Sequence, residues 1–141
     1  MKENQGRVLG IDYGSKRVGV SVSDPLGILS QGVATLNNDA QLLDRLVGII
    51  QDQNVKTIVV GMPYDLEGGK GAKAIEVDDF IERLRGVTSV DIQTWDESYS
   101  SVNAQRAFIE SGMKRKKRQQ KHRVDEMAAR LMLQEYLDQR H

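Results

Sequence analysis

Four acidic residues stand at the ends of expected secondary-structure elements, where side chains from distant parts of the chain can meet. Asp12 ends one apolar run, Asp96 and Glu97 end another, and Asp125 lies in the first turn of the last expected helix. Carboxylates at close range repel one another and take up protons unless cations neutralise them. Oxygen ligands suit Mg²⁺ or Mn²⁺, and two such ions about 3.5–4 Å apart can activate water in phosphodiester cleavage. The four acids are therefore candidate metal ligands.

Each acid also has an ordinary structural explanation. Asp12 can form the turn that follows it, and Asp96 can cap the next helix. Glu97 and Asp125 are both favoured near a helix N-terminus by the helix dipole. The chemical interpretation therefore requires that the acids lie together in the fold.

Asp125 is a better candidate than its neighbour Glu126. Glu126 has Arg130 four residues further on, which is the spacing of a surface ion pair. Asp125 shares a helix face with apolar residues, so we expect its side chain to point inward, where a carboxylate needs an ion or hydrogen bonds. Those apolar residues are Ala128, Ala129 and Met132.

Basic residues in three places could contact phosphates. Lys16 and Arg17 flank the first expected hairpin, and Lys70 and Lys73 lie in and after the glycine-rich loop 68–71. That loop does not match the Walker pattern, because no Ser or Thr follows its lysine. The third group is a run without acids, which suits a polyphosphate partner or a solvated loop equally well. It comprises Lys114, Arg115, Lys116, Lys117, Arg118, Lys121 and Arg123.

Hydrophobic periodicity predicts an α/β fold. Strands are expected at Arg7–Asp12, Lys16–Ser23, Gly27–Leu36, Thr57–Gly61 and Val90–Trp95. One helix is expected after a cap at Asp39, and three more are expected from Ala72 to about Gly86, at Ser100–Glu110 and at Val124–Leu137. Three strands joined as hairpins and followed by right-handed crossovers give a mixed five-stranded sheet with helices on both faces. This is the arrangement of the ribonuclease H-like fold, in which ligands collect at the carboxyl ends of the central strands.

Length and composition exclude several other classes. The 141 residues predict a single domain over 1–141. The absence of cysteine excludes disulfides, zinc–thiolate sites and cysteine nucleophiles, and two histidines are too few for a His-based metal site. No apolar run is long enough for a membrane span, and the first residues lack a signal-peptide core, so we expect a cytoplasmic protein without membrane contact.

Four sequence blocks in order resemble the YqgF-type family, whose members are described as nucleases of precursor 16S ribosomal RNA or as Holliday-junction resolvases. The first block is Gly10-Ile11-Asp12-Tyr13-Gly14-Ser15-Lys16-Arg17-Val18-Gly19-Val20 with Ser23-Asp24. The second contains Gly61, Pro63, Gly68, Gly71, Ala74, Val77 and Phe80. The third is Asp96-Glu97 with Ser100, Ser101 and Ala104, and the fourth is Asp125-Glu126-Met127-Ala128-Ala129 running into Leu133–Leu137.

This resemblance implies a metal-dependent nuclease that matures the 5′ end of 16S rRNA in the bacterial cytoplasm. It assigns Asp12, Glu97 and Asp125 to the family's proposed acidic triad, and Asp96 to a further acid. Relatives often have Arg-Leu where this chain has Ser98-Tyr99, so one plausible phosphate contact is missing here.

Two alternatives stay open. The first is a resolvase of branched DNA with the same metal chemistry, and such enzymes usually work as dimers because they cut two symmetric strands. The second is a non-catalytic module that binds RNA or the ribosome. The expected partner is nucleic acid in each case, with ribosome association an option and a monomer or weak homodimer as the assembly.

Overall fold

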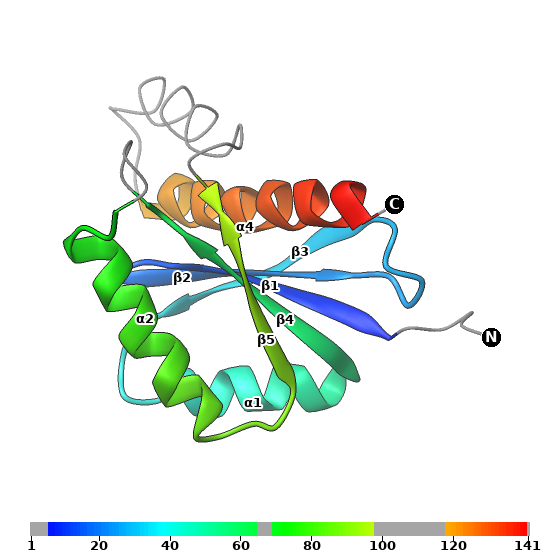
Figure 1. Ribbon diagram of the computed structural model, residues 1–141, viewed down its shortest axis with the longest axis horizontal. Helices are drawn as coiled ribbons and strands as arrows, with labels where there is room; N and C mark the ends of the chain where they lie inside the picture. Colours follow the sequence, from blue (N-terminus) through cyan, green and yellow to red (C-terminus); the bar gives the residue numbers. More distant parts are fainter. Residues whose placement is uncertain (1–5, 65–68, 98–117, 141) are drawn as a thin grey trace.

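The computed structural model describes residues 6–64, 69–97 and 118–140, with side chains described from Val124 onward in the last segment. Five strands form one mixed sheet in the order β3-β2-β1-β4-β5 (Figure 1). The strands are β1 (Arg7–Tyr13), β2 (Arg17–Ser23), β3 (Ser30–Asn37), β4 (Val55–Met62) and β5 (Asp91–Asp96). β2 pairs antiparallel with β1 and β3, whereas β1, β4 and β5 run parallel. β1 is the central strand of the sheet, and β4 lies beside it.

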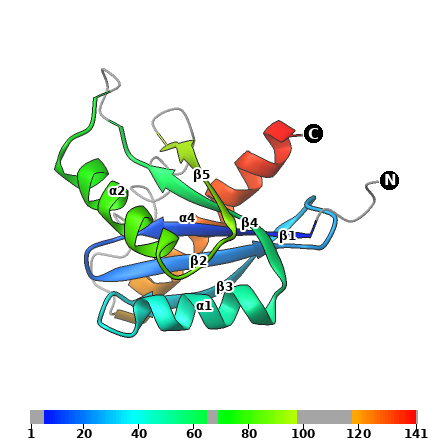
Figure 2. The ribbon, with the colours of Figure 1, turned by 60° about the horizontal axis from the view of Figure 1, so that its bottom comes forward.

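Helices cover both faces of this sheet. Helices α1 (Leu42–Asp52) and α2 (Ala72–Arg85) lie on one face, and α4 (Arg118–Arg140) crosses the other (Figures 1 and 2). Two separate apolar clusters form as a result. One joins β1, β2 and β4 to α1 and α2, and the other joins β1 and β4 to α4.

Strand alternation decides which side chains of β1 face α4. Leu9 and Ile11 are fully buried in the cluster with α1 and α2, whereas Val8 belongs to the cluster with α4. Because successive side chains point to opposite faces of a strand, Asp12 lies on the α4 face. The same alternation places Gly10 under α4, where a Cβ would lie 2.9 Å from Cβ of Leu133.

Two helix boundaries differ from expectation. Helix α1 begins at Leu42, and Asp39 forms a turn before it, in which its Oδ1 accepts a hydrogen bond from the Gln41 amide at 3.0 Å. Helix α4 begins at Arg118 rather than Val124, so the backbone of residues 118–123 is helical and not a loop. Lys, Arg and Gln are good helix formers, and here they extend the packed part of the helix.

The helix predicted at Ser100–Glu110 lies outside the described residues. Among the helices of the described segments, none combines the length and the apolar character that crossing a membrane requires.

Candidate active site

The parallel strands β1, β4 and β5 end at one edge of the sheet. One buried acid lies near the end of β1, and another directly follows β5. Asp12 is the next-to-last residue of β1 and is 6% exposed, and Glu97 directly follows β5 and is 5% exposed. Carboxylates are rarely buried to this extent unless they are paired or bind an ion. This edge is therefore the first place to look for chemistry.

Helix α4 brings Asp125 to the same edge because β2 has a glycine beneath it. Gly19 pairs with Asp12 in the β1–β2 register. The backbone carbonyl oxygen of Asp125 lies where a Cβ of residue 19 would be. Only glycine allows this close approach of helix and strand, so Asp125 is held above the strand pair that carries Asp12.

Asp12 and Asp125 line one cavity of about 310 Å³. Three basic residues share it: Lys16 directly before β2, Arg17 at the start of β2, and Lys73 in the first turn of α2. Gly14 and Ser15 complete the described lining. The cavity thus combines two carboxylates with three cations, which is the chemistry that a metal ion and a phosphate group would require.

Glu97 lies over Gly61 of β4, the strand next to the one that carries Asp12. A Cβ at residue 61 would stand 2.6 Å from Oε2 of Glu97. Gly61 shares its face of β4 with Val59, which packs in the α4 cluster, so Glu97 is on the same face of the sheet as Asp12. Glu97 is not among the described residues that line the cavity of Asp12 and Asp125. Asp96, the last residue of β5, is partly exposed and precedes it.

Arg17 forms an ion pair with Asp125. Its Nε donates to Oδ2 of Asp125 at 2.7 Å, and the two side chains are 26% and 16% exposed. The sequence alone does not indicate this partner, because the two residues are 108 positions apart. This pair shows that Arg17, expected as a phosphate contact, also contacts an acid of the site.

The donor chemistry fits a hard divalent cation, although the described residues do not form a complete cage. No three acidic or histidine side chains in the described segments lie close enough together to hold one ion. Mg²⁺ keeps several waters and commonly binds through one or two carboxylates plus substrate phosphates. Asp12 and Asp125, as two carboxylates in one cavity, meet that smaller requirement.

The remaining basic candidates are placed differently. Lys70 donates to Oδ2 of Asp78 at 2.7 Å, and this hydrogen bond raises the pKa of Lys70 above its usual value. Lys114, Arg115, Lys116 and Lys117 lie outside the described residues, as do the side chains of Arg118, Lys121 and Arg123. Lys16, Arg17 and Lys73 are therefore the three candidates that the structure brings to the acids.

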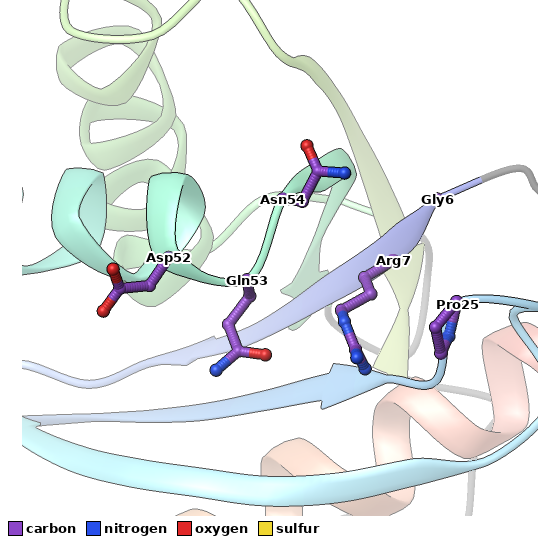
Figure 3. Close-up of a pocket in the computed structure, with 6 residues that line it drawn as sticks. All are labelled: Gly6, Arg7, Pro25, Asp52, Gln53 and Asn54. Carbon is purple, nitrogen blue, oxygen red and sulfur yellow. The ribbon is translucent and has the colours of Figure 1, made fainter.

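A second cavity, of about 280 Å³, lies at the opposite edge of the sheet and is lined by Gly6, Arg7, Pro25, Asp52, Gln53 and Asn54 (Figure 3). Asp52 is the one acid in this described lining, and Nη1 of Arg7 donates to the backbone oxygen of Ser23 at 3.0 Å. This second cavity lacks the two carboxylates of the first cavity, which remains the candidate active site.

The chain matches a protein-family model and several named relatives along nearly all of its length. The model of the RuvX family, described as Holliday junction resolvase, matches residues 6–139. A protein of Halothermothrix orenii with the name "Putative pre-16S rRNA nuclease" is 39% identical over 134 residues, which are 94% of each chain. A protein of Geobacillus kaustophilus with the same name is 41% identical over 136 residues, 94% of this chain and 97% of the other.

Two solved structures share the fold. Thermus thermophilus RuvC in complex with a Holliday junction has a TM-score of 0.61 at 13% identity and covers 96% of each chain. The fowlpox virus Holliday junction resolvase has a TM-score of 0.55 at 10% identity and covers 94% of this chain and 99% of the other. The predicted ribonuclease H-like architecture is confirmed.

Proposed function

Because this chain belongs to the RuvX family, we propose that it is a divalent-metal-dependent nuclease that matures the 5′ end of the 16S rRNA precursor. The whole chain would act as one catalytic domain, in the cytoplasm, where precursor rRNA is processed. The observation that carries this proposal is the cavity in which Asp12 and Asp125 lie beside Lys16, Arg17 and Lys73.

Asp12 and Asp125 are the residues that would hold the cation, and Glu97 and Asp96 would contribute from the end of β5. A bound Mg²⁺ or Mn²⁺ supplies activation of the attacking water and stabilisation of the leaving oxygen. The contribution of the protein itself is to position the carboxylates that would hold this cation. Asp12 is fixed by its strand, and Asp125 is fixed by the contact between its backbone and Gly19.

The basic side chains would place the scissile phosphate. Lys16, Arg17 and Lys73 come from two distant parts of the chain and line one cavity with the acids. Phosphate contacts of this kind orient a nucleic acid without reading its sequence. The basic run from Lys114 to Arg123 would add contacts to the backbone of the same substrate, since seven cations without an acid suit a polyphosphate.

We prefer precursor rRNA over branched DNA as the substrate. The relatives that carry the rRNA name are about 40% identical to this chain along nearly all of its length. The resolvases with known structures are 13% identical or less, so their likeness supports the fold and not the substrate. A four-way junction would also require a dimer, because two symmetric strands must be cut.

Incubation of the purified protein with precursor 16S rRNA and, separately, with a four-way DNA junction tests the proposal. Each substrate is supplied with Mn²⁺ or with a chelator. We expect cleavage at the 5′ end of the rRNA that requires Mn²⁺, and slower cleavage of the junction. Preferential cutting of the junction would make the protein a resolvase, and binding of rRNA without cleavage under any condition would make it a binding module.

A further inference from the structure

The ion pair between Arg17 and Asp125 occupies the carboxylate that the proposed cation would use. Nε of Arg17 lies 2.7 Å from Oδ2 of Asp125, and both side chains are mostly shielded from water. Both residues line the cavity that also contains Asp12. A guanidinium and a divalent cation at the same carboxylate repel each other, and this repulsion is poorly screened in a partly buried site.

From this geometry we propose that Arg17 competes with the divalent cation for Asp125 and exchanges that carboxylate for a substrate phosphate when nucleic acid enters. The inference rests on the proposed function, since it concerns the same cation and the same substrate. It adds that, in the absence of nucleic acid, the protein binds its cation less tightly than the same carboxylates would without Arg17.

The exchange needs side-chain rotation and no movement of the backbone. The carbonyl oxygen of Asp125 packs directly against Gly19, so α4 lies close on β2 at this point. Arg17 pairs with Asn37 in the β2–β3 ladder, so its backbone is fixed. The long arginine side chain is the part that can change its partner.

A phosphate can replace the carboxylate of Asp125 as the hydrogen-bond acceptor of Arg17. The planar guanidinium matches the oxygens of a phosphate and can donate two parallel hydrogen bonds to them. Lys16 and Lys73 in the same cavity attract the same phosphate. Nucleic acid and cation would therefore each favour the binding of the other.

The inference predicts that Arg17→Gln changes the affinity for the cation and the affinity for RNA in opposite directions. Two binding measurements test this. The first is the affinity for Mn²⁺ without nucleic acid, followed by electron paramagnetic resonance of the free ion, and we expect it to rise about tenfold. The second is the affinity for a labelled RNA spanning the 5′ end of the 16S precursor, measured by anisotropy with a chelator present, and we expect it to fall. A merely structural role for Arg17 would weaken both.

Arg45→Gln is the matched control, since Arg45 also pairs with an acid, Asp39, at 3.3 Å but outside the cavity. It should leave both affinities unchanged. Arg17→Lys keeps the charge and should raise the Mn²⁺ affinity less than Arg17→Gln, and it decides the question if Arg17→Gln does not fold. Equal or weaker Mn²⁺ binding by both Arg17 variants, with the wild type binding Mn²⁺, overturns this inference alone. A wild type that binds no Mn²⁺ overturns the proposed function with it.

Discussion

Glu97 occupies its place because residue 61 has no side chain. Three atoms of Glu97 lie within 3.1 Å of the position that a Cβ on Gly61 would take. The two nearest of these atoms, Oε2 and Cδ, are the far end of a flexible side chain, which can rotate away from an added methyl group. A methyl group at residue 61 would therefore move the carboxylate while leaving the backbone of β4 in place.

Gly61→Ala should thus reduce cleavage far more than stability. We expect the rate of precursor cleavage to fall about a hundredfold, since a displacement of about 1 Å at a reacting group can cost that much. The free energy of unfolding, measured with urea, should change by less than about 1 kcal/mol because the neighbour can give way. Cleavage at the wild-type rate would show that the position of Glu97 does not matter to the reaction.

The sequence identified the acids of this site more readily than the residues that position them. Asp12 and Asp125 could be chosen from their residue type and their place at the ends of elements. Gly19 and Gly61 could not, because the need for glycine depends on which residue lies opposite in the folded chain. The Arg17–Asp125 pair was missed for the same reason, since only the packing of α4 on β2 brings the two residues together.

At the scale of elements, the contact of α4 with the sheet holds the site together. Gly10 lies under Leu133 and Gly19 under Asp125. The hydroxyl of Ser21 donates a hydrogen bond of 2.9 Å to the backbone oxygen of Ala129. Small residues on two neighbouring strands thus allow the helix to approach the backbone of the sheet.

Gly19→Ala should push α4 away from β2 and weaken both stability and cleavage. The added methyl group would collide with a backbone carbonyl, which cannot turn aside, so we expect a loss of about 1–3 kcal/mol in the free energy of unfolding. Urea denaturation followed by circular dichroism measures this change.

Gly48→Ala is the control for that substitution. Gly48 lies in α1 with nothing within 4 Å of the added Cβ, and alanine is the better helix former by about 0.5–1 kcal/mol. It should stabilise the protein without altering cleavage. A Gly19→Ala protein as stable as the wild type would contradict the role given to this contact.

Element boundaries were predicted less well than element order. The strands were found because their apolar residues run continuously or alternate, as in β1 and β2. Asp39 was expected to cap α1, but it forms a separate turn two residues earlier. Helix α4 starts at Arg118, inside the basic run, whereas hydrophobic periodicity predicted its start at Val124.

At the scale of the whole molecule, the direction of the strands decides where the acids meet. Parallel pairing of β1, β4 and β5 places Asp12 and Glu97 at one edge. Helix α4 crosses the face of the sheet (Figure 1) and brings Asp125 to the same edge. The chain has a formal net charge of zero. Its candidate site nevertheless gathers three basic side chains and two acidic ones, so attraction to phosphate is local rather than a property of the whole surface.

The most direct test of the account is Asp12→Asn, which keeps the size of the side chain and removes its charge. Cleavage of precursor 16S rRNA with Mn²⁺ should fall by about a hundredfold or more, because a carboxylate that holds the cation is lost. Binding of the same RNA, measured with a chelator present, should stay within about twofold, since Lys16, Arg17 and Lys73 remain in place. Asp44→Asn, at an exposed acid of α1, should behave as the wild type. Cleavage by Asp12→Asn at the wild-type rate, in protein free of contaminating nuclease, would contradict the central claim.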